Sequence, residues 1–264
     1  MSRLNRIGGH VAAGNRLWPA LFFLLAFLAV WEAGVRVFAI KPYLLPAPSQ
    51  VIITLGDMLP LLANHSKSTI LAAVSGLAAA VAVALVLAVL MDLHPWVRQG
   101  LYPLLVVSQT VPIISIAPLF IIWFGYGILP KVVVVALVCF FPVVVSLVEG
   151  MQSADGDMVN LLRVMGYSRW QVIRVVRFPA ALPSFFAGLK IAGTYSVMGA
   201  VIGEWLGAVS GLGVFMTRAT HAYQLDRVFA AIFIIVLVSL LIYTLIELLA
   251  RLVMPWYYNE RRNN

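Results

Sequence analysis

Charged residues are scarce in this chain of 264 residues: only 11% are Asp, Glu, Lys or Arg, while 62% are hydrophobic. Soluble domains are usually about 25% charged and about 45–50% apolar. A mean hydropathy of +1.00 exceeds what a globular core absorbs. The composition therefore excludes an ordinary soluble protein and predicts that a bilayer surrounds most of the chain. Basic residues in loops at the membrane surface explain the net charge of +8 more simply than nucleic-acid binding does.

Cysteine and histidine are also rare. The one cysteine, Cys139, excludes an internal disulfide and, inside an apolar run, indicates a small core residue. The four histidines, His10, His65, His94 and His221, fall in expected tails or loops without the spacing of metal ligands. No metal site is predicted.

Catalytic motifs are absent from the sequence. It has no glycine-rich Walker A loop, no Gly-x-Ser-x-Gly elbow and no His-Glu-x-x-His pair. The chain is therefore not expected to be an enzyme, to hydrolyse nucleotide by itself or to carry a cofactor.

Long apolar stretches dominate what is present. Each has roughly the 20 residues that a helix needs to cross the hydrocarbon core. The expected spans cover about 17–40, 69–91, 101–124, 129–148, 184–208 and 228–252. A proline-rich segment and a short amphipathic segment (51–62) separate the first two. We predict an all-α, polytopic membrane protein with about six transmembrane helices in one domain (17–252), flanked by tails at 1–16 and 253–264.

One polar stretch, 149–183, interrupts the apolar pattern. It is expected to form two short amphipathic helices separated at Gly166, because glycine adopts backbone angles that other residues resist. Asp155 and Asp157 suit the start of the first helix. Pro179 and Pro183 are expected to stop the second helix. Arginine-bearing helices of this kind predict a folded cytoplasmic loop.

Basic residues set the expected orientation, because they are in excess on the cytoplasmic side of membrane proteins. With both termini and the 149–183 loop inside, arginines outnumber the basic residues that would face outward. The residues placed inside are Arg3, Arg6, Arg16, Arg98, Arg163, Arg169, Arg174, Arg177, Arg251, Arg261 and Arg262.

Polar side chains within or beside the spans are candidates for a transport pathway. Gln109 and Ser115 lie in a proline-broken span, and Tyr195 and Glu204 lie in the fifth. The alternative for the first two is hydrogen bonding between helices. For Glu204 it is a solvated position at the interface, or a hydrogen bond to Trp205 or to nearby backbone. Lys190 is expected to extend toward the cytoplasmic headgroups.

The polar stretch resembles the coupling segment of importer-type ABC permeases, which reads Glu-Ala-Ala, three residues, Gly, then about nine residues to Ile-x-Leu-Pro. Gly166 holds the glycine place, and residues 178–183 match the closing stretch. Asn160, Leu161 and Leu162 replace Glu-Ala-Ala, so the glutamate's salt bridge is not expected. The segments 45–48, 112–125, 141–142 and 203–213 are similar to the nitrate/sulfonate/taurine branch, and the likeness covers about 40–255.

This resemblance implies a permease subunit in a bacterial inner membrane. A homodimer would form the pathway, two ATPase subunits would bind ATP and magnesium, and an extracytoplasmic binding protein would deliver the solute. The residues expected to contact the ATPase are Asn160, Leu161, Leu162, Met165, Gly166, Tyr167, Ser168, Pro179 and Pro183. Residues 190–213 look most like permeases for a hydroxymethylpyrimidine-type thiamine precursor; sulfonate, taurine, nitrate and riboflavin are the other expected substrates.

Two alternatives stay open at this point. The 149–183 loop could rest on anionic lipid instead of binding an ATPase. The chain could also be an ion-coupled secondary transporter or a channel, a class that uses buried charges or inverted repeats. An intramembrane enzyme would need a catalytic constellation that the sequence lacks.

Overall fold

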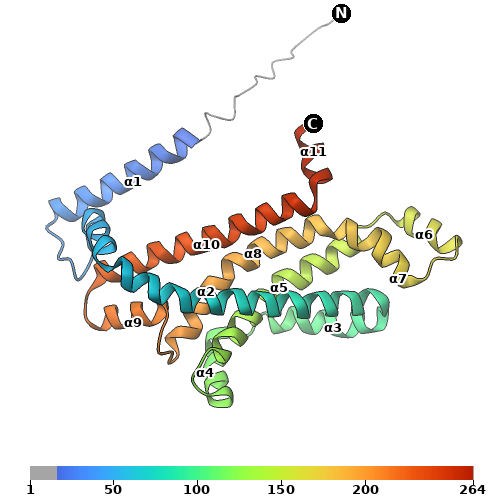
Figure 1. Ribbon diagram of the computed structural model, residues 1–264, viewed down its shortest axis with the longest axis horizontal. Helices are drawn as coiled ribbons and strands as arrows, with labels where there is room; N and C mark the ends of the chain where they lie inside the picture. Colours follow the sequence, from blue (N-terminus) through green and yellow to red (C-terminus); the bar gives the residue numbers. More distant parts are fainter. Residues whose placement is uncertain (1–16, 264) are drawn as a thin grey trace, which may run out of the picture.

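The computed structural model describes residues 17–263, with side chains described for residues 18–259 (Figure 1). Within these residues every regular element is a helix, as predicted. Five helices are long and apolar enough to cross a membrane, or six if one bent pair counts as a span. The tail predicted for residues 1–16 lies outside the described residues.

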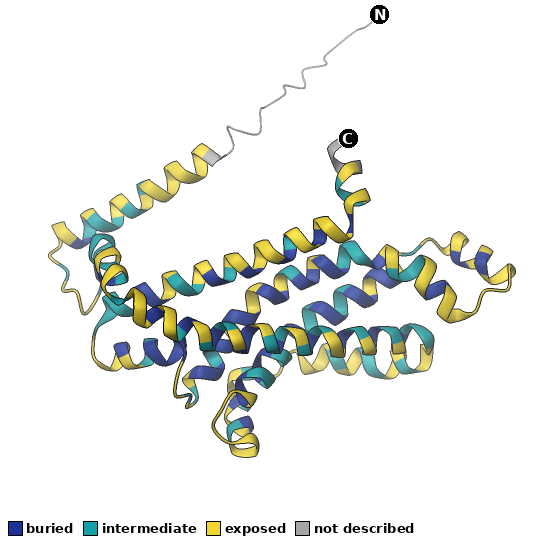
Figure 2. Cartoon of the chain, in the orientation of Figure 1, coloured by how far each residue is buried: buried dark blue, intermediate teal, exposed yellow. Residues whose placement is uncertain are grey.

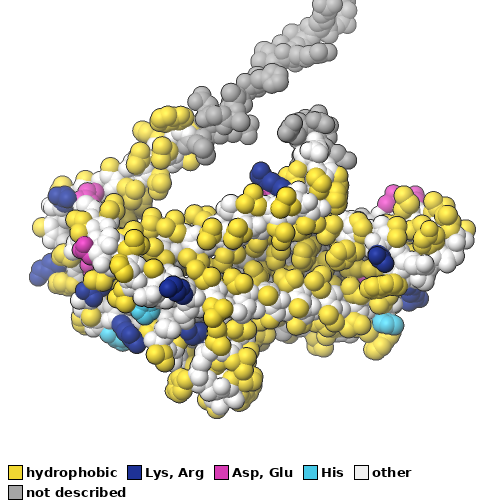
Figure 3. Space-filling model, in the orientation of Figure 1, with side chains coloured by type: hydrophobic (Ala, Val, Ile, Leu, Met, Phe, Trp, Pro, Cys, Tyr) yellow, Lys and Arg dark blue, Asp and Glu magenta, His cyan; other side chains and the backbone are white. Residues whose placement is uncertain are grey.

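The surface supports a membrane setting. Hydrophobic side chains cover the middle of the molecule, whereas most of the charged side chains gather toward the two ends of its long axis (Figure 3). The 149–183 loop lies at one end, and helix α9 with the α1–α2 connection lies at the other (Figure 1). The long axis therefore runs between the two faces of the membrane.

Helix α1 (Leu17–Val37) runs away from the other helices and exposes most of its apolar side chains (Figures 1 and 2). Near its end, Arg36 Nε lies 2.6 Å from Glu32 Oε1. Ser49 also donates to Glu32, from its backbone N–H (3.0 Å) and its hydroxyl (2.8 Å). These bonds tie the end of α1 to the start of α2.

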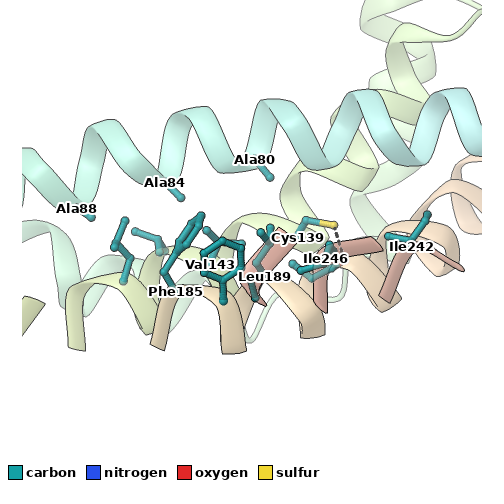
Figure 4. Close-up of a cluster of buried hydrophobic side chains, with 14 of the residues drawn as sticks. Ala80, Ala84, Ala88, Cys139, Val143, Phe185, Leu189, Ile242 and Ile246 are labelled. Carbon is teal, nitrogen blue, oxygen red and sulfur yellow. Dashed lines mark hydrogen bonds between the residues drawn. The ribbon is translucent and has the colours of Figure 1, made fainter. Parts of the chain in front are cut away.

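Helix α2 (Pro48–Leu93) corrects the prediction of a separate amphipathic segment before the second span. Both belong to one helix of 46 residues that continues through Pro60. At 1.5 Å per residue it is about 69 Å long, roughly twice the hydrocarbon thickness. Small residues at intervals of four, including Ala80, Ala84 and Ala88, form its buried face toward the core (Figure 4). The helix therefore joins the middle of the molecule to both ends.

The third predicted span is two helices. Helices α3 (Pro95–Ser108) and α4 (Ile113–Phe124) meet at an angle of 100°. Pro112 directly precedes α4 with extended backbone, because its ring prevents the chain from continuing the preceding helix. A single kinked span was expected here, so this element is a broken or re-entrant one.

The core lies where α5 (Leu129–Gln152) crosses α8 (Phe178–Trp205), with α2 and α10 against them (Figure 4). Cys139 is fully buried there, as predicted, and its thiol lies 3.2 Å from the Ala192 carbonyl oxygen. A Cβ at Gly188 would come within 2.5 Å of the Pro142 carbonyl oxygen. The two backbones therefore touch, which is how small residues bring membrane helices together.

The prediction that Pro179 and Pro183 end the second loop helix is wrong. Helix α7 (Arg169–Val172), the π-helical turn η2 (Ile173–Arg177) and α8 follow one another without a break. Pro179 is the second residue of α8, close to η2, and Pro183 is accommodated inside the helix. The π-helical turn η2, which is wider than an α-helical turn, joins α7 to the proline-bearing start of α8.

The remaining helices complete the end opposite the loop and the C-terminus. Helix α9 (Leu212–His221) occupies part of the polar segment between the last two predicted spans, and no helix was predicted there. Helix α10 (Leu225–Val253) matches the sixth span. Helix α11 (Pro255–Asn263) turns away from it (Figure 1).

Candidate functional site

The first helix of the polar loop and the corner after it form as the sequence predicts, whereas the second helix, α7, continues into α8. Helix α6 (Gly156–Val164) begins at Asp155, whose carboxylate accepts the backbone N–H of Asp157 at 2.9 Å. Gly166 has a φ of +86°, in the region that favours glycine. Ser168 then starts α7 with a reciprocal capping box, in which Gln171 accepts the backbone N–H of Ser168 at 2.7 Å. Local chemistry thus fixes the corner.

The two faces of α6 have different roles. Val159 and Leu162 are buried against Val172 of α7, so Leu162 holds the loop together. The prediction that Leu162 is presented to a partner is therefore wrong, since only 9% of its surface is exposed. Leu161 and Met165 are exposed, as expected of docking residues.

Further loop residues are exposed. Asn160, Tyr167 and Ser168 are accessible. Val164 is 87% exposed, and Trp170 is also exposed. Sequence reasoning missed both as docking candidates, although Val164 lies three residues after Leu161 on one helix and would have followed from that spacing.

Arginines join the loop to the ends of α2 and α3. Arg169 Nη1 donates to the Leu93 carbonyl oxygen at 3.0 Å. Arg177 forms an ion pair with Asp92 at the end of α2. Arg98 of α3 donates to the side chain of Gln152 at 2.6 Å. These contacts therefore hold the loop against the membrane helices.

Glu204 lies at the opposite end of α8, and only 1% of its surface is exposed. Its carboxylate accepts hydrogen bonds from the Gly213 N–H (2.8 Å) and from the Thr69 hydroxyl (2.9 Å). Lys131 Nζ, which is also buried, lies 3.8 Å away. A solvated position is therefore wrong, whereas the alternative of a hydrogen bond to nearby backbone is confirmed by the Gly213 N–H. Burial leaves Glu204 without access to a pathway in this conformation.

The surrounding polar groups are bonded in the same network. Lys131 Nζ donates to the Ser210 carbonyl (2.8 Å), and the Leu212 N–H donates to the Thr69 hydroxyl (2.9 Å). The Gly211 N–H donates to His65 Nδ1 at 3.1 Å. His65 lies in α2, whereas a tail or loop position was predicted. The network ties the 206–211 loop to α2 and α5. Sequence reasoning missed Lys131, Thr69 and His65 because they are distant from Glu204 in the chain.

The other polar candidates do not converge on one site. Gln109 directly follows α3, Ser115 lies in α4 and Tyr195 in α8, and all three are exposed. The neighbouring hydroxyls of Ser108 and Thr110 donate to carbonyls of their own segment, at 2.8 and 2.7 Å, and not to another helix. Any pathway through these residues would need a surface from a second molecule.

Lys190 has a partner that was not predicted. It pairs with Glu247 of α10 at 2.6 Å. Arg251 (3.0 Å) and the hydroxyl of Tyr258 (3.3 Å) bind the same carboxylate. Glu247 was overlooked because it lies in an otherwise apolar run, although a carboxylate there needs a partner.

Comparison with known proteins agrees with this architecture. The family model for the inner membrane component of binding-protein-dependent transport systems matches residues 76–256. The chain belongs to this family. The match includes the polar loop, α5, α8 and both members of the Lys131–Glu204 pair, so the chain is a multi-pass membrane permease and a component of an ABC importer. The family implies an ATPase and a substrate-binding protein as partners.

Individual relatives cover nearly the whole permease. A formylaminopyrimidine transport permease of Halalkalibacterium halodurans is 39% identical over 91% of this chain and 96% of its own. A riboflavin transport system permease of Chloroflexus aurantiacus is 34% identical over 96% and 97%. A taurine transport system permease of Escherichia coli is 31% identical over 89% and 88%. These names differ in substrate, so they place the permease in the predicted branch without fixing its solute.

Proposed function

We propose that two copies of this permease form the pathway of an ATP-driven importer in a bacterial inner membrane, with both termini in the cytoplasm. Two ATPase subunits bind the cytoplasmic loops and hold the ATP and magnesium, for which this chain has no motif. An extracytoplasmic binding protein delivers the solute at the end that carries Glu204. Family membership and the form of the 149–183 loop support this assignment.

The observation that carries the mechanism is the unbroken helical run from the loop to the opposite end. From Arg169 to Trp205 it covers 37 residues, or about 55 Å at 1.5 Å per residue. This exceeds the hydrocarbon thickness of about 30 Å. A displacement at α7 is therefore transmitted along α8 toward Glu204. The π-helical turn η2 lies within this run, and such turns are frequent at functional sites.

The docking surface is the exposed face of the corner. Leu161, Val164 and Met165 supply apolar side chains for a groove in the ATPase, a helix-in-groove contact. Arg163 and Arg174 are exposed and would steer the loop toward an acidic rim. Because Asn160 stands where the family pattern has glutamate, this contact relies on apolar and basic side chains.

The pathway is proposed to lie between the two copies. Ile191, Tyr195 and Met198 lie on one exposed face of α8, at helical spacing. Tyr195 combines an aromatic ring with a hydroxyl, which suits a small polar heterocycle. Gln109 and Ser115 are the remaining pathway candidates, and both are exposed.

The proposed solute is a hydroxymethylpyrimidine-type thiamine precursor. Its support is the 39% identity with a formylaminopyrimidine permease over 91% of this chain. Aliphatic sulfonate, taurine, nitrate and riboflavin are the competing solutes in the same test. The alternative function is an ion-coupled transporter. Its support is two ion pairs within the spans, Lys131–Glu204 and Lys190–Glu247, because charges inside a membrane often mark an ion pathway.

Reconstitution in proteoliposomes tests both assignments. The permease is combined with its ATPase and its binding protein, and uptake of each labelled solute is measured with and without ATP. We expect ATP-dependent uptake of the pyrimidine, abolished when the ATPase is omitted. Uptake driven by a proton or sodium gradient without the ATPase would refute the importer, and preference for another solute would refute only the substrate.

A further inference from the structure

A cavity of about 360 Å³ lies between the polar loop and the ends of α2 and α3. It is separate from the Glu204 network, which lies at the other end of α8. The residues around it are Met91, Asp92, Pro95, Arg98, Arg163, Arg169, Val172 and Arg177. Its size falls within the range of small-ligand pockets.

The cavity carries an unbalanced positive charge. Four arginines face one carboxylate, and Arg177 already pairs with that carboxylate of Asp92. Arg98 and Arg169 bind neutral acceptors, a glutamine side chain and a backbone carbonyl. Among the described residues, Arg163 has neither an ion pair nor a hydrogen-bonded acceptor. Three guanidinium groups thus remain without a counter-charge around one space.

The surroundings place this cavity at the membrane surface. Helix α2 ends at Leu93, and Trp96 in the first turn of α3 is 75% exposed. Tryptophan is enriched at the level of the lipid headgroups. Exposed apolar residues such as Leu90 and Leu104 lead away from this turn along α2 and α3. A phosphate at headgroup depth would therefore meet the arginines.

We propose that the cavity binds a phosphate group, supplied by the headgroup of an anionic phospholipid or by a soluble phosphate compound. The planar fork of arginine matches the oxygens of a phosphate. Arg98 comes from α3 and Arg163 from α6, so one bound phosphate bridges the membrane helices and the loop. Its occupancy would hold the corner in place before any ATPase binds. The site goes beyond the importer assignment and does not depend on it.

The test uses the full-length permease in neutral detergent. Its thermal stability is measured with added phosphatidylglycerol, phosphatidylcholine, inorganic phosphate or glycerol 3-phosphate. Arg163→Gln removes an exposed guanidinium from the cavity, and Arg163→Lys keeps the charge without the fork. Arg174→Gln is the matched control, because Arg174 is exposed on the same loop and does not line the cavity.

A phosphate-bearing ligand is expected to raise the Tm of the wild type, and phosphatidylcholine is not. Arg163→Gln should weaken the apparent affinity by about tenfold, the effect of losing one hydrogen bond to a charged group; Arg163→Lys should lie between the two, and Arg174→Gln should match the wild type. Stabilisation by phosphatidylglycerol alone identifies a lipid site, and stabilisation by inorganic phosphate or glycerol 3-phosphate identifies a soluble ligand. No selective stabilisation, or equal losses for Arg163→Gln and Arg174→Gln, would overturn the proposal.

Discussion

Truncating Glu204 to alanine probes the buried network at the end of α8. The substitution removes the acceptor of the Gly213 N–H and of the Thr69 hydroxyl, and the partner of buried Lys131. None of these groups lies where water could readily replace the lost carboxylate, because Thr69 and Lys131 are buried too. The substitution therefore leaves donors and a charge without their partner.

The expected loss follows from these contacts. Removing one member of a buried pair destabilises by about 3–5 kcal/mol. Lys131 keeps its bonds to the Ser210 carbonyl and the Ser68 hydroxyl, so the lower end, about 3 kcal/mol, applies. At about 2 °C or more per kcal/mol for a chain of this size, the Tm falls by roughly 6 °C. Glu204→Gln keeps the shape of the side chain and one acceptor oxygen, so it should lose about half as much stability as Glu204→Ala.

The assay is a double-mutant cycle in detergent with Glu204→Gln, Lys131→Met and the double variant. Because the two side chains share a network, their effects should be coupled by about 1–2 kcal/mol. The control is Gly56→Ala, a helical site with open space around it, which should not lower the Tm. Additive losses, or an unchanged Tm for Glu204→Ala, would show that Glu204 and Lys131 do not stabilise the fold together.

Three further predictions concern the core and the loop. Gly188→Val should lower stability by about 1–3 kcal/mol, measured as Tm, because its side chain would meet the Pro142 carbonyl; a neutral effect would contradict the α5–α8 contact. Leu161→Asp should keep the Tm but abolish ATPase-dependent uptake, whereas Leu162→Asp should also lower the Tm, because Leu162 is buried in the loop; matching Tm values would show that the two faces are misassigned. Gly166→Pro should uncouple ATP hydrolysis from uptake, because proline cannot adopt a φ of +86°; normal transport would argue against a fixed corner.

Much of the fold could be predicted because the bilayer makes apolar length a strong signal. The spans, the helix break at Gly166 and the start of α6 near Asp155 all depend on local chemistry. The continuity of α2 through Pro60 and of α8 through Pro183 could not be predicted, since neighbouring helices and the π-helical turn accommodate these prolines. The break after α3 coincides with Pro112, but a proline alone does not fix the 100° angle between α3 and α4.

The site was harder to predict than the fold. The exposure of Leu161 and Met165 was expected, but the burial of Leu162 depends on how α6 packs against α7. Glu204 was identified as unusual, yet its role rests on Lys131 and Thr69, which are far away in sequence. Pairing at such distances leaves no local pattern in a single sequence.

Site-specific crosslinking can show whether the exposed corner of the polar loop binds the ATPase. Cys139 is buried, so Met165→Cys introduces an accessible thiol in intact membranes that hold the assembled transporter, with Arg36→Cys as the control at the opposite end. We expect an adduct between the permease and its ATPase from position 165 and none from position 36. An accessible thiol at position 165 that forms no adduct with the ATPase, in complexes that hydrolyse ATP and transport, would contradict this expectation.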